Sequence, residues 1–150
     1  MREFMSRALR KLSRMNDSQL RSFIQLIADD YALFDAMMDS LTSGVIILDS
    51  DHTIIKTNRA ASRILGIPLS ESPDRPLWTS ISDTKLADFI RMVIQNEEAH
   101  IAEEFVIAAD EGNQYIEISL LPLVKEKKVR GTIITVEDIT QRKRAEINNR

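Results

Sequence analysis

The chain has 150 residues, of which 43% are hydrophobic and 29% are charged, and its formal net charge is −3 at pH 7. It contains no cysteine, which excludes thiolate nucleophiles, cysteine-ligated zinc and thiolate-held iron–sulfur clusters and fits a reducing cytoplasm. No apolar run approaches the ~20 residues of a membrane span, and no basic excess favours nucleic-acid binding. One domain with appended helices is therefore predicted.

The first predicted element is a long helix that begins at Asn16 or Asp17. Asn16 and Gln19 have the spacing of a reciprocal helix cap, and Gly44 suits a helix stop. Apolar residues then recur at alternating spacings of four and three, as in the seam of a coiled coil: Leu20, Ile24, Ile27, Tyr31, Phe34, Met38 and Leu41. We favour a homodimer formed through this seam. The alternative is an amphipathic helix that packs on its own domain.

From Gly44 the apolar pattern changes to short strands. Residues 45–48 and 53–57 are rich in β-branched side chains and are predicted as two strands joined by a polar turn. Asn58 is predicted to cap a short helix over residues 59–65, which ends at Gly66.

A loop and a second helix follow. Residues 67–82 contain three prolines and two serine clusters, which indicates loop with at most single helical turns. Ser82 or Asp83 then begins a helix whose apolar residues form one stripe: Leu86, Phe89, Ile90, Val93 and Ile94.

Three further strands are predicted at residues 103–109, 114–121 and 129–137, with a hairpin turn at 110–113. In the second of them Ile116, Ile118 and Leu120 alternate with Tyr115, Glu117 and Ser119, which predicts one buried face and one exposed face. The polar tail 138–150 suits a helix and stops without a C-cap, so we expect a fragment of a longer protein. The order of elements predicts an α+β fold, in which helices cover one face of an antiparallel sheet.

Several short motifs in this order resemble a PAS sensor domain. They are the first strand Gly-Val-Ile-Ile-Leu-Asp, the helix start Asn58-Arg59-Ala60-Ala61, Leu65-Gly66, the Asp-Glu-Gly hairpin and the closing Glu137-Asp138-Ile139-Thr140. The resemblance extends from about Phe34 to Arg142. It implies a five-stranded antiparallel PAS sheet over residues 44–138, a helical dimerisation segment over 1–43 and the start of an output helix over 139–150.

The resemblance also implies a function. Similar modules pass a signal to a C-terminal output domain in the same chain, most often in cytoplasmic two-component histidine kinases, and also in diguanylate cyclases and transcription regulators. In such families the Asp-Ile-Thr triplet ends the last strand and begins the output helix. Signal transfer is therefore expected at Asp138, Ile139, Thr140 and Arg142. Asp138 is expected to cap the helix, with Thr140 as an alternative, and to pair with Arg142 four residues later.

PAS domains often hold a small-molecule ligand between the sheet and the helices. Candidate pocket residues are Trp78, Phe89, Met92, Val93 and Phe105, and the alternative is a packed core. Flavins or chromophores attached through cysteine are excluded. Haem stays open, because the resemblance places an axial histidine near the end of the helix that begins at Ser82 or Asp83. His100 occupies that region, although a loop histidine is the simpler interpretation.

No catalytic motif is present in the sequence. It has no glycine-rich phosphate loop and no His-Glu-x-x-His pair. Asp49, Asp51 and His52 suit a polar turn better than a metal site. The chain itself is therefore predicted not to be an enzyme, although its parent protein is expected to be a histidine kinase.

Overall fold

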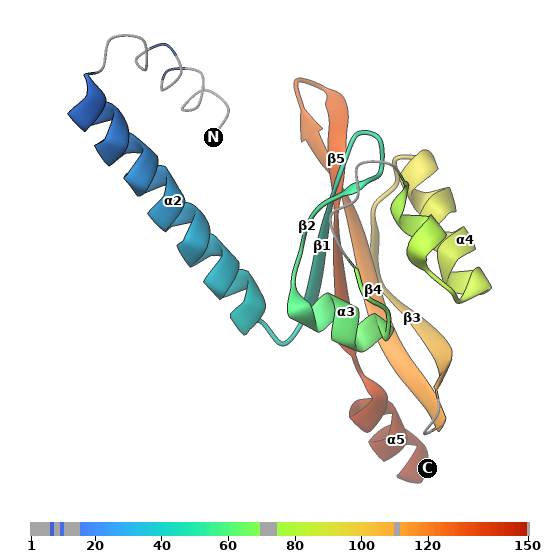
Figure 1. Ribbon diagram of the computed structural model, residues 1–150. Helices are drawn as coiled ribbons and strands as arrows, with labels where there is room; N and C mark the ends of the chain where they lie inside the picture. The colour runs from blue at the N-terminus through green and yellow to red at the C-terminus, as the bar shows by residue number, and fades with distance from the viewer. Residues whose placement is uncertain (1–6, 8–9, 11–15, 70–74, 110–111, 150) are drawn as a thin grey trace. The chain divides into compact units, whose positions relative to one another are not determined.

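The computed structural model describes residues 7, 10, 16–69, 75–109 and 112–149 (Figure 1). The chain divides into two compact units, residues 1–37 and residues 38–150. Most of the predicted 1–43 segment before Asn16 lies outside the described residues, as do residues 110–111 of the predicted hairpin turn.

Helix α2 (Asp17–Ser40) begins at the predicted cap. The backbone N–H of Gln19 donates to Asn16 Oδ1 at 2.8 Å, and that of Asn16 donates to Gln19 Oε1 at 3.2 Å. This reciprocal pair satisfies amides that the helix itself cannot bond. The helix ends at Ser40, so Leu41 lies outside it.

The predicted helix stop at Gly44 is wrong, because Gly44 is the first residue of a strand. The glycine is needed there for close packing against helix α3 (Arg59–Leu65). A Cβ atom at this position would lie 2.7 Å from the Cα of Ala61.

The exposed apolar surface of α2 is broader than the predicted seam. Ile24, Ile27, Tyr31 and Phe34 are exposed, as the seam requires, and so are Leu26, Leu33 and Met37 on an adjacent stripe. Met38 was assigned to the seam, but it is only 7% exposed and belongs to the 38–150 unit. The exposed row of α2 therefore ends at Phe34.

The 38–150 unit contains a five-stranded antiparallel sheet of order β2-β1-β5-β4-β3, which confirms the predicted fold. Its strands are β1 (Gly44–Asp49), β2 (Ile54–Thr57), β3 (His100–Ala109), β4 (Gly112–Lys125) and β5 (Lys128–Asp138). The last three are longer than predicted, because cross-strand pairing continues beyond the residues in which buried and exposed side chains alternate. In consequence His100 begins β3 and is not a loop residue.

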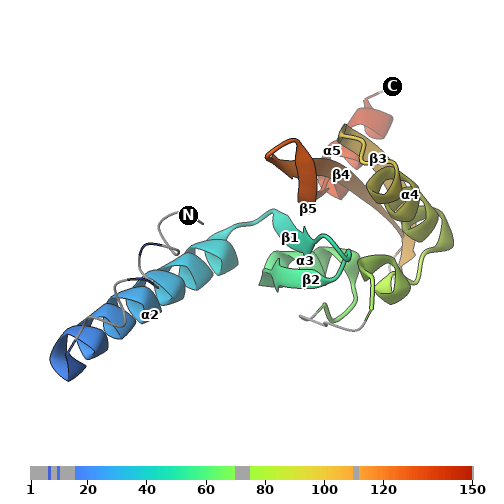
Figure 2. The same cartoon turned by 90° about the horizontal axis from the view of Figure 1, so that it is seen from above.

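Short helices cover one face of this sheet (Figures 1 and 2). They are α3 (Arg59–Leu65), η1 (Leu77–Ser80) and α4 (Thr84–Gln95), and α5 (Thr140–Asn148) follows β5. The predicted start of α4 and the predicted end of α3 are confirmed. Asp83 Oδ1 accepts the N–H of Leu86 at 3.0 Å, and Gly66 ends α3 with φ 68°, a left-handed conformation that glycine adopts without strain.

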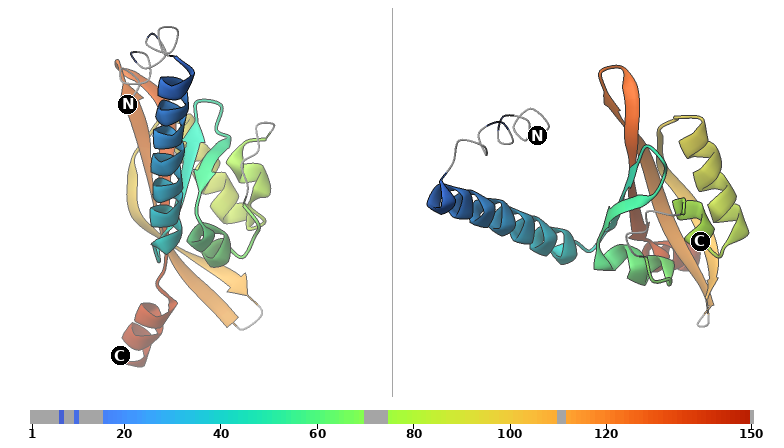
Figure 3. Two further views of the ribbon diagram at one scale, coloured as in Figure 1. Left: turned by 60° about the vertical axis from the view of Figure 1, so that its left-hand side comes forward. Right: turned by 45° about the horizontal axis from the view of Figure 1, so that its top comes forward.

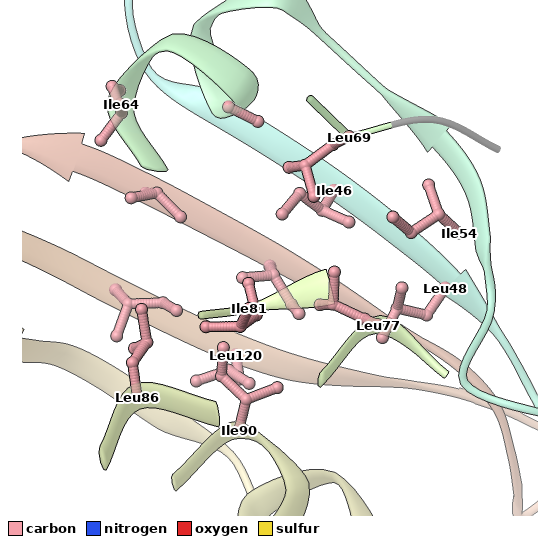
Figure 4. Close-up of a cluster of buried hydrophobic side chains, with 14 of the residues drawn as sticks. Ile46, Leu48, Ile54, Ile64, Leu69, Leu77, Ile81, Leu86, Ile90 and Leu120 are labelled. Atoms are coloured by element: carbon pink, nitrogen blue, oxygen red, sulfur yellow. The ribbon is translucent and has the colours of Figure 1, made fainter. Parts of the chain in front are cut away.

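The core lies between this sheet face and the helices (Figure 4). On β4, buried Ile116, Ile118 and Leu120 alternate with partly exposed residues, as the sequence predicted. Leu86 and Ile90 of α4 pack against them. Each such buried side chain contributes roughly 1.5–3 kcal/mol before conformational entropy is subtracted.

Candidate functional site

The junction between β5 and α5 is formed around the carboxylate of Asp138. Asp138 Oδ1 accepts the backbone N–H of Thr140 at 2.9 Å, and Oδ2 accepts a hydrogen bond from Gln114 Nε2 at 3.4 Å. The same Gln114 nitrogen donates to the carbonyl oxygen of Ile64 at 2.7 Å. Asp138 thus joins the end of the sheet to β4 and, through Gln114, to the last turn of α3.

These contacts favour the ionised form of the Asp138 carboxylate. Partial burial opposes the charge, but the hydrogen bonds from Thr140 and Gln114 and the nearby positive charge of Arg144 outweigh burial and lower the pKa of Asp138.

The next two residues continue the pairing of β5 with β4 into the start of α5. The N–H of Ile139 donates to the carbonyl oxygen of Tyr115 at 2.9 Å, and Thr140 Oγ1 accepts the N–H of Tyr115 at 3.0 Å. The Ile139 side chain is buried. The first residues of α5 are therefore held by the backbone of β4.

The cap position of α5 differs from the prediction. Ile139 occupies it, without a side-chain cap bond. Thr140 does not cap the helix, since its hydroxyl is used on Tyr115. Asp138 lies one residue before the cap position, so the prediction that it caps α5 is wrong. It accepts instead the N–H of Thr140, two residues later.

The predicted pair between Asp138 and Arg142 is wrong. The Arg142 guanidinium donates instead to Glu117 Oε2 on β4 at 2.9 Å. Lys143 Nζ lies 2.7 Å from Glu104 Oε2 on β3. Helical spacing brings Arg142 within one turn of Asp138, but Glu117 on the sheet is the better placed acceptor. Its position depends on the strand order, which sets β4 beside β5.

Two surface clefts meet at Asp138. One, of about 490 Å³, is lined by Thr42, Ser43, Arg63, Ile64, Glu137 and Asp138. The other, of about 430 Å³, is lined by Ala109, Gly112, Asn113, Gln114, Asp138, Thr140 and Arg144. Water therefore reaches the junction from two sides.

The structure brings together only part of the predicted ligand pocket. The rings of Phe89 and Phe105 lie 4.9 Å apart beside the core, and Val93 is fully buried in it. Trp78 packs on His52 instead, with ring centroids 5.5 Å apart, and Met92 is 47% exposed. None of the five lines the two clefts at Asp138 or the two small cavities that described residues enclose.

Two small cavities within the 38–150 unit are lined entirely by described residues. One, of about 20 Å³, lies between α3, α4 and β3, and the other, of about 40 Å³, lies beside His52 and Ile94. Ligand pockets are commonly 300–1,000 Å³, so neither of these two accommodates a ligand larger than a few waters.

His100 is placed poorly for binding haem iron. Its Nε2 lies 3.0 Å from Glu98 Oε2, its Nδ1 lies 3.5 Å from Glu103 Oε1, and Phe89 meets its ring edge-on. The hydrogen bond to Glu98 is the main reason that the pKa of His100 is raised. An axial ligand must present an unprotonated nitrogen, whereas both carboxylates here favour the protonated ring. The residues around His100 do not fit haem.

Within the described part of the chain, no group of three or more histidine, aspartate or glutamate residues is arranged to hold a metal ion. No helix in that part is both long and apolar enough to cross a membrane.

Residues 32–139 match the PAS fold family, and the chain therefore belongs to it. PAS domains are sensory, non-catalytic modules. No curated protein matches the chain.

Solved structures agree on the fold. The PAS domain of an HTR-like protein from Haloarcula marismortui has a TM-score of 0.56 at 19% identity, over 79% of this chain and 99% of that one. An RNA-binding light-oxygen-voltage receptor gives a TM-score of 0.55 at 19% identity, over 74% of this chain, which spans only 33% of the receptor. The PAS domain of the histidine kinase ThkA gives 0.50 at 21% identity, over 64% and 98%.

Sequence reasoning missed the residues of β3 and β4 that contact the junction. Gln114, Tyr115, Glu117 and Glu104 carry no motif of their own. The alternation of Tyr115 and Glu117 with buried isoleucines did place both on the face of the sheet away from the core. Only the strand order shows that this face adjoins α5.

Proposed function

We propose that this chain is the sensory and dimerisation module of a cytoplasmic two-component histidine kinase, and that Asp138, Ile139, Thr140 and Arg142 transfer the signal to its output domain. The observation that carries the proposal is the continuity between sheet and output helix. The bonds of Ile139 and Thr140 to Tyr115 mean that a displacement of β4 against β5 acts directly on the first turn of α5.

Helix α2 supports the dimerisation part of the proposal. Its exposed apolar row of Ile24, Ile27, Tyr31 and Phe34 keeps heptad spacing, which suits pairing with the same helix of a second copy. A dimer places two output helices in one assembly, as a kinase that phosphorylates across its dimer requires.

The kinase assignment is tested on the full-length protein. When it is incubated with ATP, we expect phosphate on a histidine that lies beyond residue 150, detected as an acid-labile, base-stable label. The 150-residue chain alone, which has no catalytic motif, serves as the control and should remain unlabelled. Failure of the full-length protein to label, together with synthesis of a cyclic dinucleotide from GTP or binding to DNA, would replace the kinase with another output domain.

A further inference from the structure

The end of β4 and the start of β5 form a two-stranded hairpin that projects from the sheet. Among the described residues, β3 pairs with β4 only as far as Leu120, and β1 pairs with β5 only as far as Gly131. Beyond these residues β4 and β5 pair with each other alone, up to Lys125 and Lys128. Figure 3 shows this hairpin reaching past the neighbouring strands. We call residues 121–130 the hairpin tip.

The hairpin tip is strongly basic within an acidic chain. It holds four cations, Lys125, Lys127, Lys128 and Arg130, against the one carboxylate of Glu126, so its net charge is +3 whereas that of the whole chain is −3. Glu126 lies 3.8 Å from Arg130. Of the carboxylates that the structure describes, none forms an ion pair with the three lysines. The lysine charges are therefore uncompensated within the described part of the chain.

This arrangement of charge works against the stability of the hairpin. Lys125 and Lys128 are paired directly across the two strands, where like charges are destabilising. The turn residues Glu126 and Lys127 have φ of 54° and 64°, a left-handed backbone that asparagine and glycine adopt at lower cost. Folding alone would favour Asn-Gly in such a turn. The charged tip is better explained by a contact outside the domain.

Exposed apolar side chains accompany the lysines. On β4, Ile118 and Leu120 turn into the core, so the alternating residues Leu121 and Leu123 lie on the opposite face of the sheet, where they are 41% and 38% exposed. Val124, beside the first lysine, is 63% exposed. The hairpin tip thus combines aliphatic side chains with positive charge, and it contains no aromatic residue.

This combination favours an anionic lipid surface as the partner. Lysine is a strongly hydrated point charge, which suits a diffuse layer of headgroups. Nucleic-acid strands and protein hot spots instead favour arginine and aromatic side chains. Lysine stems and aliphatic side chains can enter the boundary between headgroups and acyl chains while the ammonium groups stay in water.

We propose that the hairpin tip docks this chain onto an anionic membrane surface through Lys125, Lys127, Lys128 and Val124. The lipid headgroups supply the negative charge that the described carboxylates do not, and the exposed valine enters the layer below them. The contact does not depend on which output domain follows the chain.

Vesicle sedimentation with the 150-residue chain tests the contact. The probe is phosphatidylcholine vesicles that contain about one third phosphatidylglycerol, and vesicles of phosphatidylcholine alone are the comparison. We expect binding to the anionic vesicles only, and weaker binding when NaCl is raised from about 0.05 M to about 0.5 M. Replacing Lys125→Gln, Lys127→Gln and Lys128→Gln together should weaken binding by about fivefold per lysine, or about 100-fold in all.

The matched control is Arg21→Gln with Lys85→Gln and Arg91→Gln. These three exposed cations lie on α2 and α4, away from the hairpin tip, and their replacement makes the same change in net charge. Binding of this control to the anionic vesicles should stay within about twofold of the wild type. Melting temperatures of both triple variants should match that of the wild type, because all six positions are exposed.

A second measurement reports where the tip lies. Since the chain has no cysteine, Val124→Cys carries a single environment-sensitive fluorophore. Its emission should shift to the blue on anionic vesicles, as the label leaves water. Ile55→Cys, at a position on β2 that is 50% exposed, should show no shift with the same label.

No binding to anionic vesicles, or equal binding by the wild type and the triple lysine variant, would overturn the proposal. The sequence has a second basic segment in residues 1–14, and vesicle binding that depends on those residues and not on the lysines of the tip would also overturn it. Tighter binding to DNA or polyglutamate than to vesicles, with no blue shift at position 124, would replace the lipid surface with a nucleic acid or an acidic protein.

Discussion

Four hydrogen bonds converge on the buried side chain of Asn58. Its Oδ1 accepts the N–H groups of Val45 and Ala61 at 2.9 and 3.1 Å. Its Nδ2 donates to the carbonyl oxygens of Met38 and Ser43 at 2.8 and 3.0 Å. One amide therefore joins the end of α2, the start of β1 and the start of α3.

Asn58→Ala should lower the free energy of unfolding by about 2–4 kcal/mol, because it removes a helix cap and leaves buried backbone groups unbonded. Asn58→Asp keeps the acceptor but places a charge against two carbonyl oxygens, and should be no better. Urea denaturation provides the measurement. Asn96→Ala, at an exposed asparagine, is the control and should change stability by less than about 0.5 kcal/mol. A similar small loss at Asn58 would show that the bonds there are replaceable.

His100 gives the fold a predictable pH dependence. Its pKa is raised in the folded chain, first by the hydrogen bond to Glu98 and also by Glu103. The contribution of His100 to stability is therefore complete below the unfolded pKa near 6.5, and it is lost as the pH rises through the folded pKa. His100→Gln should destabilise the chain more at pH 5.5 than at pH 8.5, measured by urea denaturation. A loss that is independent of pH would contradict the ion pair.

At the residue scale the sequence predicts local bonds better than distant ones. The Asn16–Gln19 pair and the caps at Asn58 and Asp83 were predictable, because donor and acceptor lie three residues apart. The bond between Arg142 and Glu117 spans 25 residues. Nothing in the spacing favours it over the wrong i, i+4 partner.

At the scale of elements, α2 connects the sequence pattern to assembly. Replacing Ile27→Asp and Phe34→Asp puts charge into the proposed dimer interface and should yield monomers at micromolar concentration. Sedimentation equilibrium or light scattering measures the mass. Gln25→Asp with Ala32→Asp places the same charges on the opposite side of the helix and should leave the dimer intact. If the first variant also stays dimeric, α2 does not form the interface.

The contact between β1 and α3 depends on the absence of a side chain at Gly44. Gly44→Ala should cost about 1–3 kcal/mol, because its Cβ would lie 2.7 Å from the Cα of Ala61 and the two backbones must separate. Gly66→Asn is the comparison, since that position needs only a left-handed backbone and no atom lies within 4 Å of an added Cβ. Urea denaturation of both variants should show the larger loss at position 44. Equal losses would mean that the packing is not tight.

Elements were predicted well where periodicity was strong and poorly at their ends. The 3.6-residue stripe of α4 and the alternation in β4 each identified the buried face. Gly44 was misplaced because a glycine after an apolar helix resembles a stop. Its real role, close approach to Ala61, depends on a residue 17 positions later.

At the scale of the whole molecule, the order of motifs predicted the fold. Each motif is short, but their order along the chain resembles that of a PAS domain. The sheet has the strand order β2-β1-β5-β4-β3, in which the last strand of the chain lies beside both β1 and β4. This central position of β5 explains why its final residue, Asp138, can report on the sheet. The ligand pocket was not predictable, because apolar residues at helical spacing serve a packed core equally well.

The central claim is that Asp138 couples the sheet to the output helix, and its most direct test is Asp138→Ala in the full-length protein, with output activity and melting temperature measured side by side. Losing the hydrogen bond to the Thr140 N–H removes about 1 kcal/mol from the start of α5, which changes a two-state population about fivefold. We predict a change in output of that order, up or down, with the PAS core still folded. Asp88→Ala, which breaks an exposed pair with Arg91 on α4, should change neither quantity. Unchanged output in Asp138→Ala, or output lost only in step with a large fall in melting temperature, would contradict the claim.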